Sequence, residues 1–238
     1  MATNKFIEQV NNSKLEFADK QIKNWYDVFK KDYEPFVVCR EWISDTSINI
    51  GSVIGTKHPD YIGLTWREFI KVGKRMPSNI QLYEQNPDYY YTVDKKLPEI
   101  SYISIDKTNY YVDADGNHRT AIAKFIFENS RLFQGVSITN LKIDYDFYKF
   151  YVGFIQTIKA KNLPLHVGVN SKHVAREDGS GWCRDYFETE FSVVNYRNNT
   201  HAYYSKTEFG MLVSYFARTN RLVRFFKVPE KFAVLRGI

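Results

Sequence analysis

The 238-residue sequence has few cysteines and no long apolar run. Its two cysteines, Cys39 and Cys183, are far apart, which argues against a disulfide scaffold and against a cysteine-rich zinc site. No stretch approaches 18 uncharged apolar residues, so the sequence predicts no membrane span and no membrane partner. The first 14 residues are polar and lack the apolar core of a secretory signal. We therefore expect a cytoplasmic protein.

Basic residues, by contrast, are concentrated at one end of the chain. The net charge is +6, and residues 197–238 carry eight basic and two acidic residues, which accounts for all of it. This imbalance suggests a polyanionic partner, either DNA or an acidic protein, although a solvated basic surface has the same composition. We expect DNA phosphates to be bound nonspecifically by Arg218, Arg221, Arg224 and Lys227.

The spacing of apolar residues predicts a mixed α/β (α+β) protein that forms a single domain over residues 1–238. Helices are predicted in the later part of 6–29 and at 64–75, 120–129, 146–161 and 206–220. Strands are predicted at 36–39, 101–106, 110–114, 136–145, 164–169, 186–196 and 222–228, with loops at 42–61 and 176–185. The strands at 101–106 and 110–114 flank a polar turn and predict a β-hairpin.

A cluster of polar residues lies where the second arm of this hairpin leads into the next helix. The segment Tyr110–Phe125 reads YYVDADGNHRTAIAKF. The first N–H groups of a helix lack an intrahelical acceptor, and the helix dipole favours negative charge at that end. A strand, a glycine turn and a helix in this order therefore predict a site for an anion.

The residues of the turn supply the donors that such a site needs. Gly116 allows a positive φ or a close approach of the backbone, and Arg119 offers a planar set of donors that suits phosphate. His118 can donate to phosphate or move a proton near neutral pH. Asn117 can donate its amide hydrogen or cap the helix.

Two aspartates in the same segment have two possible roles. Asp113 and Asp115 could hold a magnesium ion or orient His118 and Arg119. The structural alternative is an ordinary turn in which Asp115 or Asn117 caps the helix and Arg119 pairs with Asp115.

The motif Asp115-Gly116-Asn117-His118-Arg119-Thr120, followed by Ala123, resembles the signature of the ParB/sulfiredoxin superfamily. The similarity covers about residues 101–128 and, more loosely, the upstream segment RMPSNIQLYEQNP. It implies a ParB/sulfiredoxin-like core at roughly 76–170, with elaborations at both ends and a basic portion at 197–238. Members include partition proteins that bind CTP and DNA, ATP-dependent sulfiredoxins, free-serine kinases, and plasmid-encoded nuclease/ATPase proteins that inhibit conjugation.

The resemblance implies phosphate chemistry at this motif. Asn117 stands where sulfiredoxins have their cysteine, and no helix-turn-helix is evident after Asn129, so neither sulfur chemistry nor centromere binding is expected. The expected nucleotide-binding residues are Gly116, Asn117, His118, Arg119 and Thr120. The expected catalytic residues are Asp115, His118 and Arg119. The expected metal ligands are Asp113 and Asp115.

The most direct hypothesis from the resemblance is a phosphoester hydrolase, acting as a DNase or an NTPase, with Mg²⁺ and ATP or CTP as cofactors. A role in plasmid or phage biology follows from the same resemblance. Two alternatives use the same fold: a non-catalytic inhibitor or binding protein with a protein partner, and a small-molecule kinase.

Two other segments could contribute to function. Residues 172–188 concentrate charged side chains around Trp182, which could cover a pocket or stack on a base; the alternative is an exposed hairpin loop. The tyrosines at 89–91 could stack on bases, or they could fill a core.

Overall fold

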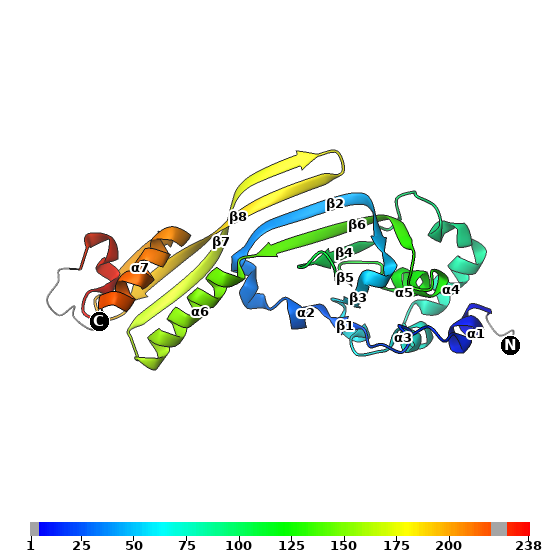
Figure 1. Ribbon diagram of the computed structural model, residues 1–238, viewed down its shortest axis with the longest axis horizontal. Helices are drawn as coiled ribbons and strands as arrows, with labels where there is room; N and C mark the ends of the chain where they lie inside the picture. Colours follow the sequence, from blue (N-terminus) through cyan, green and yellow to red (C-terminus); the bar gives the residue numbers. More distant parts are fainter. Residues whose placement is uncertain (1–4, 220–227) are drawn as a thin grey trace. The chain divides into compact units, whose positions relative to one another are not determined.

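The computed structural model describes residues 5–219 and 228–238 (Figure 1). This part of the chain is a mixed α/β fold whose strands pair in both parallel and antiparallel directions, as predicted. It forms two compact units: unit 1 contains residues 5–31, 40–141 and 177–184, and unit 2 contains 32–39, 142–176, 185–219 and 228–238. None of the helices in the described ranges is long and apolar enough to cross a membrane.

Unit 1 contains most of the short strands and helices. Its helices are α1 (Lys5–Asn12), α2 (Trp25–Val28), α3 (Trp66–Val72), α4 (Met76–Gln85), α5 (Asn117–Ile126) and the short η2 (Ile50–Ser52), η3 (Pro59–Tyr61) and η4 (Pro87–Tyr90). Its strands are β1 (Lys23–Asn24), β3 (Val53–Thr56), β4 (Ser101–Ser104), β5 (Tyr110–Val112), and parts of β2 (Val37–Asn49) and β6 (Leu132–Ile143). The strand order is β1-β3-β5-β4-β6-β2.

The β-hairpin that precedes the candidate motif is confirmed. Strands β4 and β5 pair antiparallel, with Tyr102 opposite Val112 and Ile103 opposite Tyr111. Asp106 holds the turn, because its Oδ1 accepts hydrogen bonds from the N–H groups of Thr108 and Asn109 at 2.8 and 2.7 Å. Parallel pairing of β5 with β3 and of β4 with β6 places this hairpin inside the sheet. The strand that leads into the motif is therefore paired on both sides.

Helices α3, α4 and α5 gather beside the short strands of unit 1 and enclose its apolar core (Figure 1). Helix α5 is buried on nearly every side, and Ile122 is fully inaccessible to solvent. Aromatic contacts link distant segments, as Phe17 packs on Phe125 at a ring-centroid distance of 5.1 Å and Phe6 packs on Tyr83 at 5.2 Å. These contacts pack the start of the chain against both α4 and α5.

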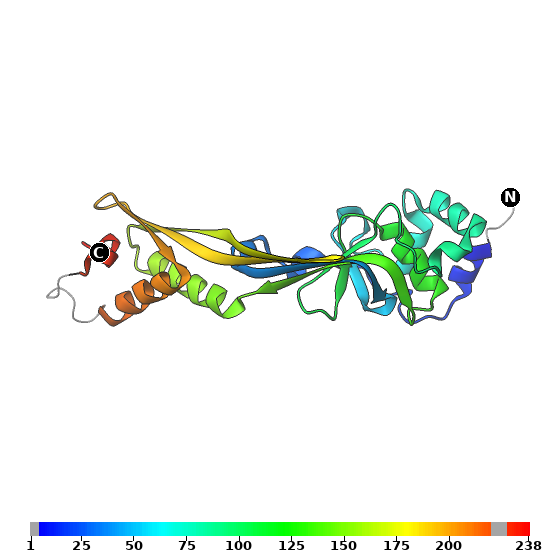
Figure 2. The ribbon, with the colours of Figure 1, turned by 90° about the horizontal axis from the view of Figure 1, so that it is seen from above.

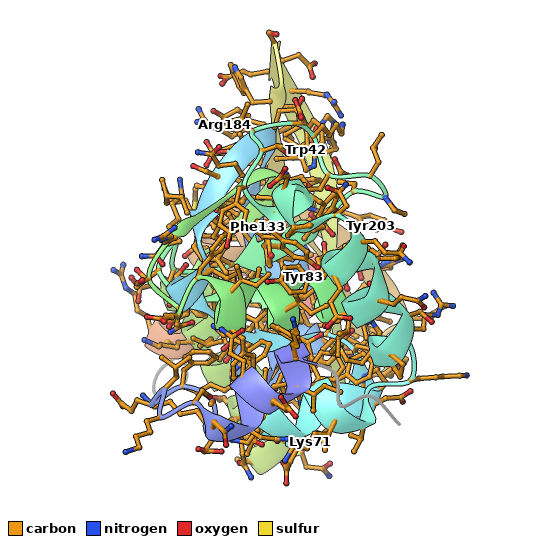
Figure 3. All side chains as sticks on the ribbon, turned by 90° about the vertical axis from the view of Figure 1, so that its right-hand side faces the viewer. Trp42, Lys71, Tyr83, Phe133, Arg184 and Tyr203 are labelled. Carbon is orange, nitrogen blue, oxygen red and sulfur yellow. The ribbon has the colours of Figure 1, made fainter. Side chains whose placement is uncertain are left out.

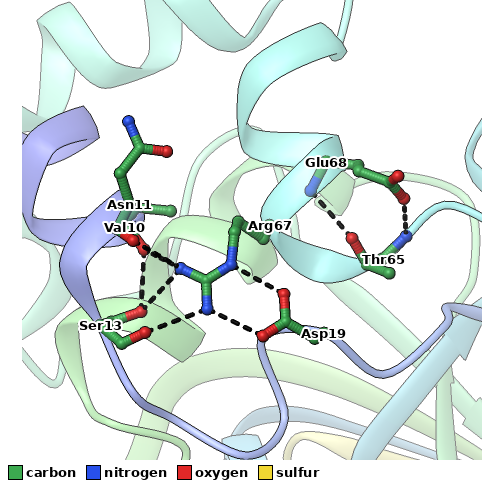
Figure 4. Close-up of polar contacts among 7 residues, drawn as sticks. All are labelled: Val10, Asn11, Ser13, Asp19, Thr65, Arg67 and Glu68. Atoms are coloured by element: carbon green, nitrogen blue, oxygen red, sulfur yellow. Dashed lines mark hydrogen bonds and ion pairs between the residues drawn. The ribbon is translucent and has the colours of Figure 1, made fainter.

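Arg67 fastens the N-terminal segment to helix α3 (Figure 4). Its guanidinium donates to both carboxylate oxygens of Asp19, at 2.8 and 3.0 Å, and to the backbone oxygens of Val10 and Ser13. Helix α3 begins at a capping box, where Thr65 and Glu68 exchange side-chain and backbone hydrogen bonds. The partly buried Arg67 therefore fixes the N-terminal segment against α3, and the capping box fixes where α3 begins.

Two buried polar side chains of α5 join the helix to the sheet. Thr56 Oγ1 donates to Asn117 Oδ1 at 2.6 Å, which links the first turn of α5 to strand β3. Tyr102 OH and Thr120 Oγ1 lie 2.8 Å apart and link the next turn to strand β4. Both hydrogen bonds are buried, so losing either partner would leave a polar group without a partner in the core.

Lys124 continues this polar stripe one turn further along α5. Its Nζ donates to the backbone oxygens of Ile50 and Val53 at 2.9 and 2.7 Å, and lies 4.7 Å from the ring centroid of Trp66 and 5.3 Å from that of Phe17. The side chain is 1% exposed. Burial lowers the pKa of the Lys124 ammonium to about 7.

Unit 2 packs two helices on a group of long strands. Its elements are η1 (Lys31–Phe36), α6 (Tyr145–Ala160), α7 (Lys206–Thr219), η5 (Glu230–Leu235), β9 (Thr200–Ser205), and parts of β7 (Leu165–Gly179) and β8 (Trp182–Asn195). Figure 2 shows α6 and α7 on the same side of these strands. Phe209 of α7 stacks on Phe191 of β8 at a centroid distance of 4.0 Å, which anchors that helix.

The helices at 64–75, 146–161 and 206–220 are confirmed in position, but the prediction for 6–29 is wrong in its later part. That segment forms only α2, preceded by turns and the two-residue strand β1. Phe17, Ile22 and Trp25 are buried, but they belong to a turn, to a non-helical link and to the start of α2, so their spacing imitates one helix.

The predicted loops at 42–61 and 176–185 are also wrong. Strand β2 runs to Asn49, β3 follows, and β7 and β8 extend into the second segment, where the turn is limited to residues 180–181. Residues 170–181 are exposed throughout, so the alternation of buried and exposed residues that reveals a strand is absent there. Strand β9 was not predicted, and the predicted strand at 222–228 lies almost wholly outside the described residues.

We expect the buried ammonium of Lys124 to make stability depend on pH. The unfolded chain keeps a lysine pKa near 10.4, so between pH 7 and 10 the unfolded state binds more protons, and stability rises with pH. From pH 7 to 9 the free energy of unfolding should increase by about 2 kcal/mol, measured by urea denaturation.

Lys124→Met should remove most of this rise. The substitution should lower the free energy of unfolding most at pH 9. At that pH the wild type carries the neutral amine, whereas the variant leaves two buried carbonyl oxygens without donors. Lys159→Met, at an exposed lysine on α6, is the matched control and should keep the wild-type profile. If the dependence of stability on pH were unchanged in Lys124→Met, it would not come from Lys124.

Candidate functional site

Gly116 sets the turn between strand β5 and helix α5. It is the N-cap of α5, with φ 111° and ψ 3°, so the helix begins three residues earlier than predicted. A Cβ at this position would lie 2.5 Å from Cγ2 of the fully buried Ile100. The absence of a side chain is thus required twice, by the backbone angle and by the packing of Ile100.

A pocket of about 330 Å³ opens at this junction in unit 1. Helix α4, the residue before it, and η4 supply one wall, which includes Tyr83 (labelled in Figure 3). The lining residues are Arg75, Asn79, Leu82, Tyr83, Asn86, Tyr89, Tyr90, Leu97, Pro98, Asp115, Gly116, His118 and Arg119. The pocket therefore combines an aromatic and apolar wall with a polar end formed by the start of α5.

The structure divides the residues of the predicted motif into two groups. Asp115, Gly116, His118 and Arg119 line the pocket. Asn117 and Thr120 are buried and hydrogen bond to the sheet, so they hold the helix instead of lining the pocket. The expectation that these two residues bind a nucleotide directly has no support in this arrangement. Their spacing on the helix explains the division, because Asn117 and Thr120 are three residues apart on the inward face.

His118 is held in an aromatic setting at the polar end of the pocket. Its ring packs against Phe69 and Tyr61 at centroid distances of 5.2 and 5.4 Å. Its Nε2 accepts a hydrogen bond from the backbone N–H of Arg75 at 3.4 Å, so the proton of the neutral ring lies on Nδ1. Burial, and then the positive charge of Arg75, lower the pKa of His118 below its ordinary value.

Arg119 is committed to contacts within the protein. Nη1 donates to Tyr89 OH at 3.0 Å and to the backbone oxygen of Pro98, and Nη2 donates to Asp115 Oδ2 at 3.1 Å. The side chain of Arg119 is 12% exposed, whereas that of Asp115 is 59% exposed. These contacts connect α5 to η4 and to the segment before β4, and they reproduce the Arg119–Asp115 pair of the structural alternative.

Arg75, Asn79 and Tyr83 are the site residues that sequence reasoning missed. The loose similarity of residues 75–87 to the superfamily was the available signal, but no single residue in that segment stood out. Asn79 Nδ2 donates to the backbone oxygen of Arg75 at 2.7 Å, which fixes the first turn of α4 beside the pocket. Tyr89, one of the tyrosines proposed to stack on bases, lines the pocket, and Tyr90 is also part of the core.

The two predicted magnesium ligands are each bound to a cation. Asp113 Oδ1 accepts from Lys57 Nζ at 2.6 Å, and Asp115 pairs with Arg119. Mg²⁺ prefers carboxylate oxygens that are free to coordinate it. Within residues 5–219 and 228–238, no group of three or more His, Cys, Asp or Glu side chains is placed to hold a metal ion. The arrangement therefore does not fit magnesium at Asp113 and Asp115, and we assign no step to a metal there.

The basic end is only partly within the described residues. Arg218 is exposed near the end of α7, whereas Arg221, Arg224 and Lys227 lie outside the described ranges. Two other basic residues of this end are paired within unit 2, Lys206 with Asp144 and Arg236 with Glu230. The charge available for a polyanion in unit 2 is therefore smaller than the sequence count suggests.

The polar segment at 172–188 is the end of a two-stranded ribbon, and many of its charged residues pair with protein groups. In unit 1, Arg184 and Lys107 bind the two carboxylate oxygens of Glu41, which lowers the pKa of Glu41 to about 2. In unit 2, His173 Nε2 lies 2.9 Å from Asp185 Oδ1. These contacts resemble those of a structural ribbon more than those of a substrate pocket.

Comparison of the chain with protein-family models, curated proteins and solved structures found no match.

Replacing Gly116 with alanine should test the packing at the junction. We expect Gly116→Ala to lower the free energy of unfolding by about 2–4 kcal/mol, because it adds both a backbone and a steric penalty. Gly63→Ala is the matched control: Gly63 also has a positive φ, but a Cβ there would contact nothing within 4 Å. Equal losses in urea denaturation of the two variants would contradict the role of Ile100.

The pKa of His118 should lie below 6.5 and respond to its neighbours. The C–H resonances of its ring, followed by NMR as a function of pH, should titrate below that value. Arg75→Gln should raise the pKa, because it removes a nearby positive charge, and Asp115→Asn should lower it further. Because the unfolded chain binds this proton first as the pH falls, stability should decline below pH 6.5. An unchanged pKa in both variants would contradict the described surroundings of His118.

Proposed function

We propose that the pocket in unit 1 binds a phosphate of a nucleotide or of DNA and promotes hydrolysis of a phosphoester. The observation that carries this proposal is the pocket lining: Gly116, His118 and Arg119, selected from sequence for phosphate binding, and Asp115, selected as a catalytic residue, line one pocket with several tyrosines. A polar end beside an aromatic and apolar wall is the combination that suits a nucleotide. The resemblance to the ParB/sulfiredoxin superfamily supports the same proposal.

The polar end offers donors without an excess of carboxylates. The first N–H groups of a helix lack intrahelical acceptors, and the residues at the start of α5 line the pocket together with two arginines. Asp115 is the acidic residue among the lining residues, and Arg119 pairs with it. The remaining positive charge favours an anion at this end of the pocket.

His118 is the residue that could take part in the chemistry. Burial lowers the pKa of His118, which favours the neutral imidazole, and with Nε2 accepting from the Arg75 N–H the ring can donate from Nδ1–H to a phosphoryl oxygen. In the proposed step, a water oxygen bonds to phosphorus and loses its proton to solvent, the phosphoester oxygen leaves with the bonding electrons and takes up a proton from solvent, and Nδ1–H of His118 donates a hydrogen bond to a phosphoryl oxygen. The N–H groups at the start of α5 would stabilise the charge on the phosphoryl oxygens.

DNA is the proposed polymeric partner, and the basic end is the proposed contact. Arg218 is exposed and is the described member of the four residues expected to bind DNA phosphates. Binding of this kind weakens steeply as salt increases, because counterions are released from DNA. A salt series of DNA binding therefore bears on this part of the proposal.

The function is tested by turnover measurements on purified protein. The wild type, His118→Asn and His201→Asn are incubated with ATP, CTP and Mg²⁺, with and without plasmid DNA. We expect phosphate release or DNA nicking that falls at least about 100-fold in His118→Asn, the usual scale of a lost hydrogen-bond donor to the transition state. His201 is an exposed histidine on β9 in unit 2, so its variant should retain full activity.

The alternatives give different results in the same experiment. Turnover that requires an added hydroxyl metabolite would identify a kinase. Nucleotide binding without turnover would identify a binding or inhibitor protein. The absence of both turnover and any nucleotide-induced thermal shift would overturn the enzyme and nucleotide proposals together.

A further inference from the structure

We infer that Arg75, rather than the motif residue Arg119, is the arginine that binds the anion, and that Arg119 is a positioning residue for the pocket wall. This inference rests on the proposed function, since it assumes that the pocket receives a phosphate-bearing ligand. It assigns the anion to a residue outside the recognised motif.

The contacts of Arg119 leave it little capacity for a ligand. Both N–H groups of Nη1 are used, one by Tyr89 OH and one by the backbone oxygen of Pro98, and Nη2 donates to Asp115. A ligand that took Arg119 would have to break bonds that join three segments of the pocket. Arg119 also sits beside the carboxylate of Asp115, which repels an incoming anion.

Arg75 differs from Arg119 in both its exposure and its contacts. It is exposed, it lines the same pocket, and its guanidinium makes no hydrogen bond or ion pair with the residues that the structure describes. Its backbone is fixed nevertheless, because its N–H donates to His118 and its C=O accepts from Asn79. The free guanidinium is therefore carried on an anchored backbone, an arrangement that reduces the entropy lost on binding.

The charge of Arg75 already acts at the polar end of the pocket. It lowers the pKa of His118, after the larger effect of burial, and it also acts to lower that of Tyr61. Among the lining residues, Arg119 is compensated by Asp115, and Arg75 is the remaining cation. A phosphate between Arg75 and His118 could accept two hydrogen bonds from the guanidinium and one from Nδ1–H of the imidazole.

The position of Arg75 also orients the rest of the ligand. Arg75 immediately precedes α4, and Asn79 and Tyr83 follow at successive turns of that helix and line the same pocket. A phosphate held by Arg75 would therefore leave the remainder of the ligand along Asn79 and Tyr83. A flat group such as a nucleobase suits the aromatic wall there.

The test compares three arginine-to-glutamine variants and uses pyrophosphate and ATP as probes. Arg75→Gln removes the proposed anion ligand, Arg119→Gln removes the wall contacts, and Arg131→Gln is the control at an exposed arginine of unit 1. Binding is measured by titration calorimetry at a temperature well below unfolding, and stability by thermal denaturation.

We expect Arg75→Gln to weaken pyrophosphate and ATP binding at least about 10-fold, the scale of one charge-assisted hydrogen bond, with an unchanged melting temperature. Arg119→Gln should lower the melting temperature by about 5 °C, since it removes three hydrogen bonds, and should weaken binding less than Arg75→Gln does. Modification by phenylglyoxal, followed by mass spectrometry, should be faster at Arg75 than at Arg119 and should be blocked by pyrophosphate.

Each other outcome has a definite meaning. Loss of binding in Arg119→Gln at an unchanged melting temperature, with Arg75→Gln like wild type, would overturn the inference and leave the proposed function standing. Pyrophosphate binding that depends on Arg75, without nucleotide binding or turnover, would support the inference and refute the proposed function. No binding of either probe by the wild type would overturn both.

Discussion

The orientation of helix α5 is the constraint on which the candidate site depends. Asn117, Thr120 and Lys124 form one inward stripe of the helix, and each is hydrogen-bonded to the sheet or to the turn before β3. Polar groups at these depths are tolerated only when they have partners, so the helix has essentially one rotation about its axis that satisfies all three. That rotation directs His118 and Arg119 toward the pocket.

A continuous polar motif is thereby divided between two tasks. In sequence, Asn117 and Thr120 are indistinguishable from His118 and Arg119, because each residue type can contact phosphate. The sequence indicates this division only in part. The spacing of three residues places Asn117 and Thr120 on one face of the helix. What sequence did not reveal was that Thr56 and Tyr102 would face them, since these partners come from strands 61 and 18 residues away.

The same distinction between local and distant information explains which elements were predicted. The β4–β5 hairpin and helices α3 and α6 are marked by local signals: a polar turn, a capping box and a regular apolar stripe. The far part of β7 is exposed at every residue, and β2 contains a run of Ser, Asp and Thr, so neither has the alternation of a half-buried strand. Their strand conformation comes from pairing with neighbours, which one segment of sequence does not encode. Arg75 was missed for a related reason, because its relevance comes from its place beside His118, 43 residues later.

The electrostatics around the pocket follow from how unit 1 satisfies its buried cations. Lys96 Nζ donates to Thr92 and lies 5.0 Å from the ring centroid of Tyr89, a pocket residue, and Lys124 uses backbone oxygens and aromatic rings. Carbonyl oxygens and ring faces stabilise these ammonium groups without cancelling their charge, as a carboxylate would. Burial accordingly lowers the pKa of both lysines, and each proton that remains adds to the positive potential in unit 1. Under the proposed function, an anion in the pocket would favour protonated Lys96, which lies beside the pocket residue Tyr89, and anion binding and protonation would strengthen each other by linkage.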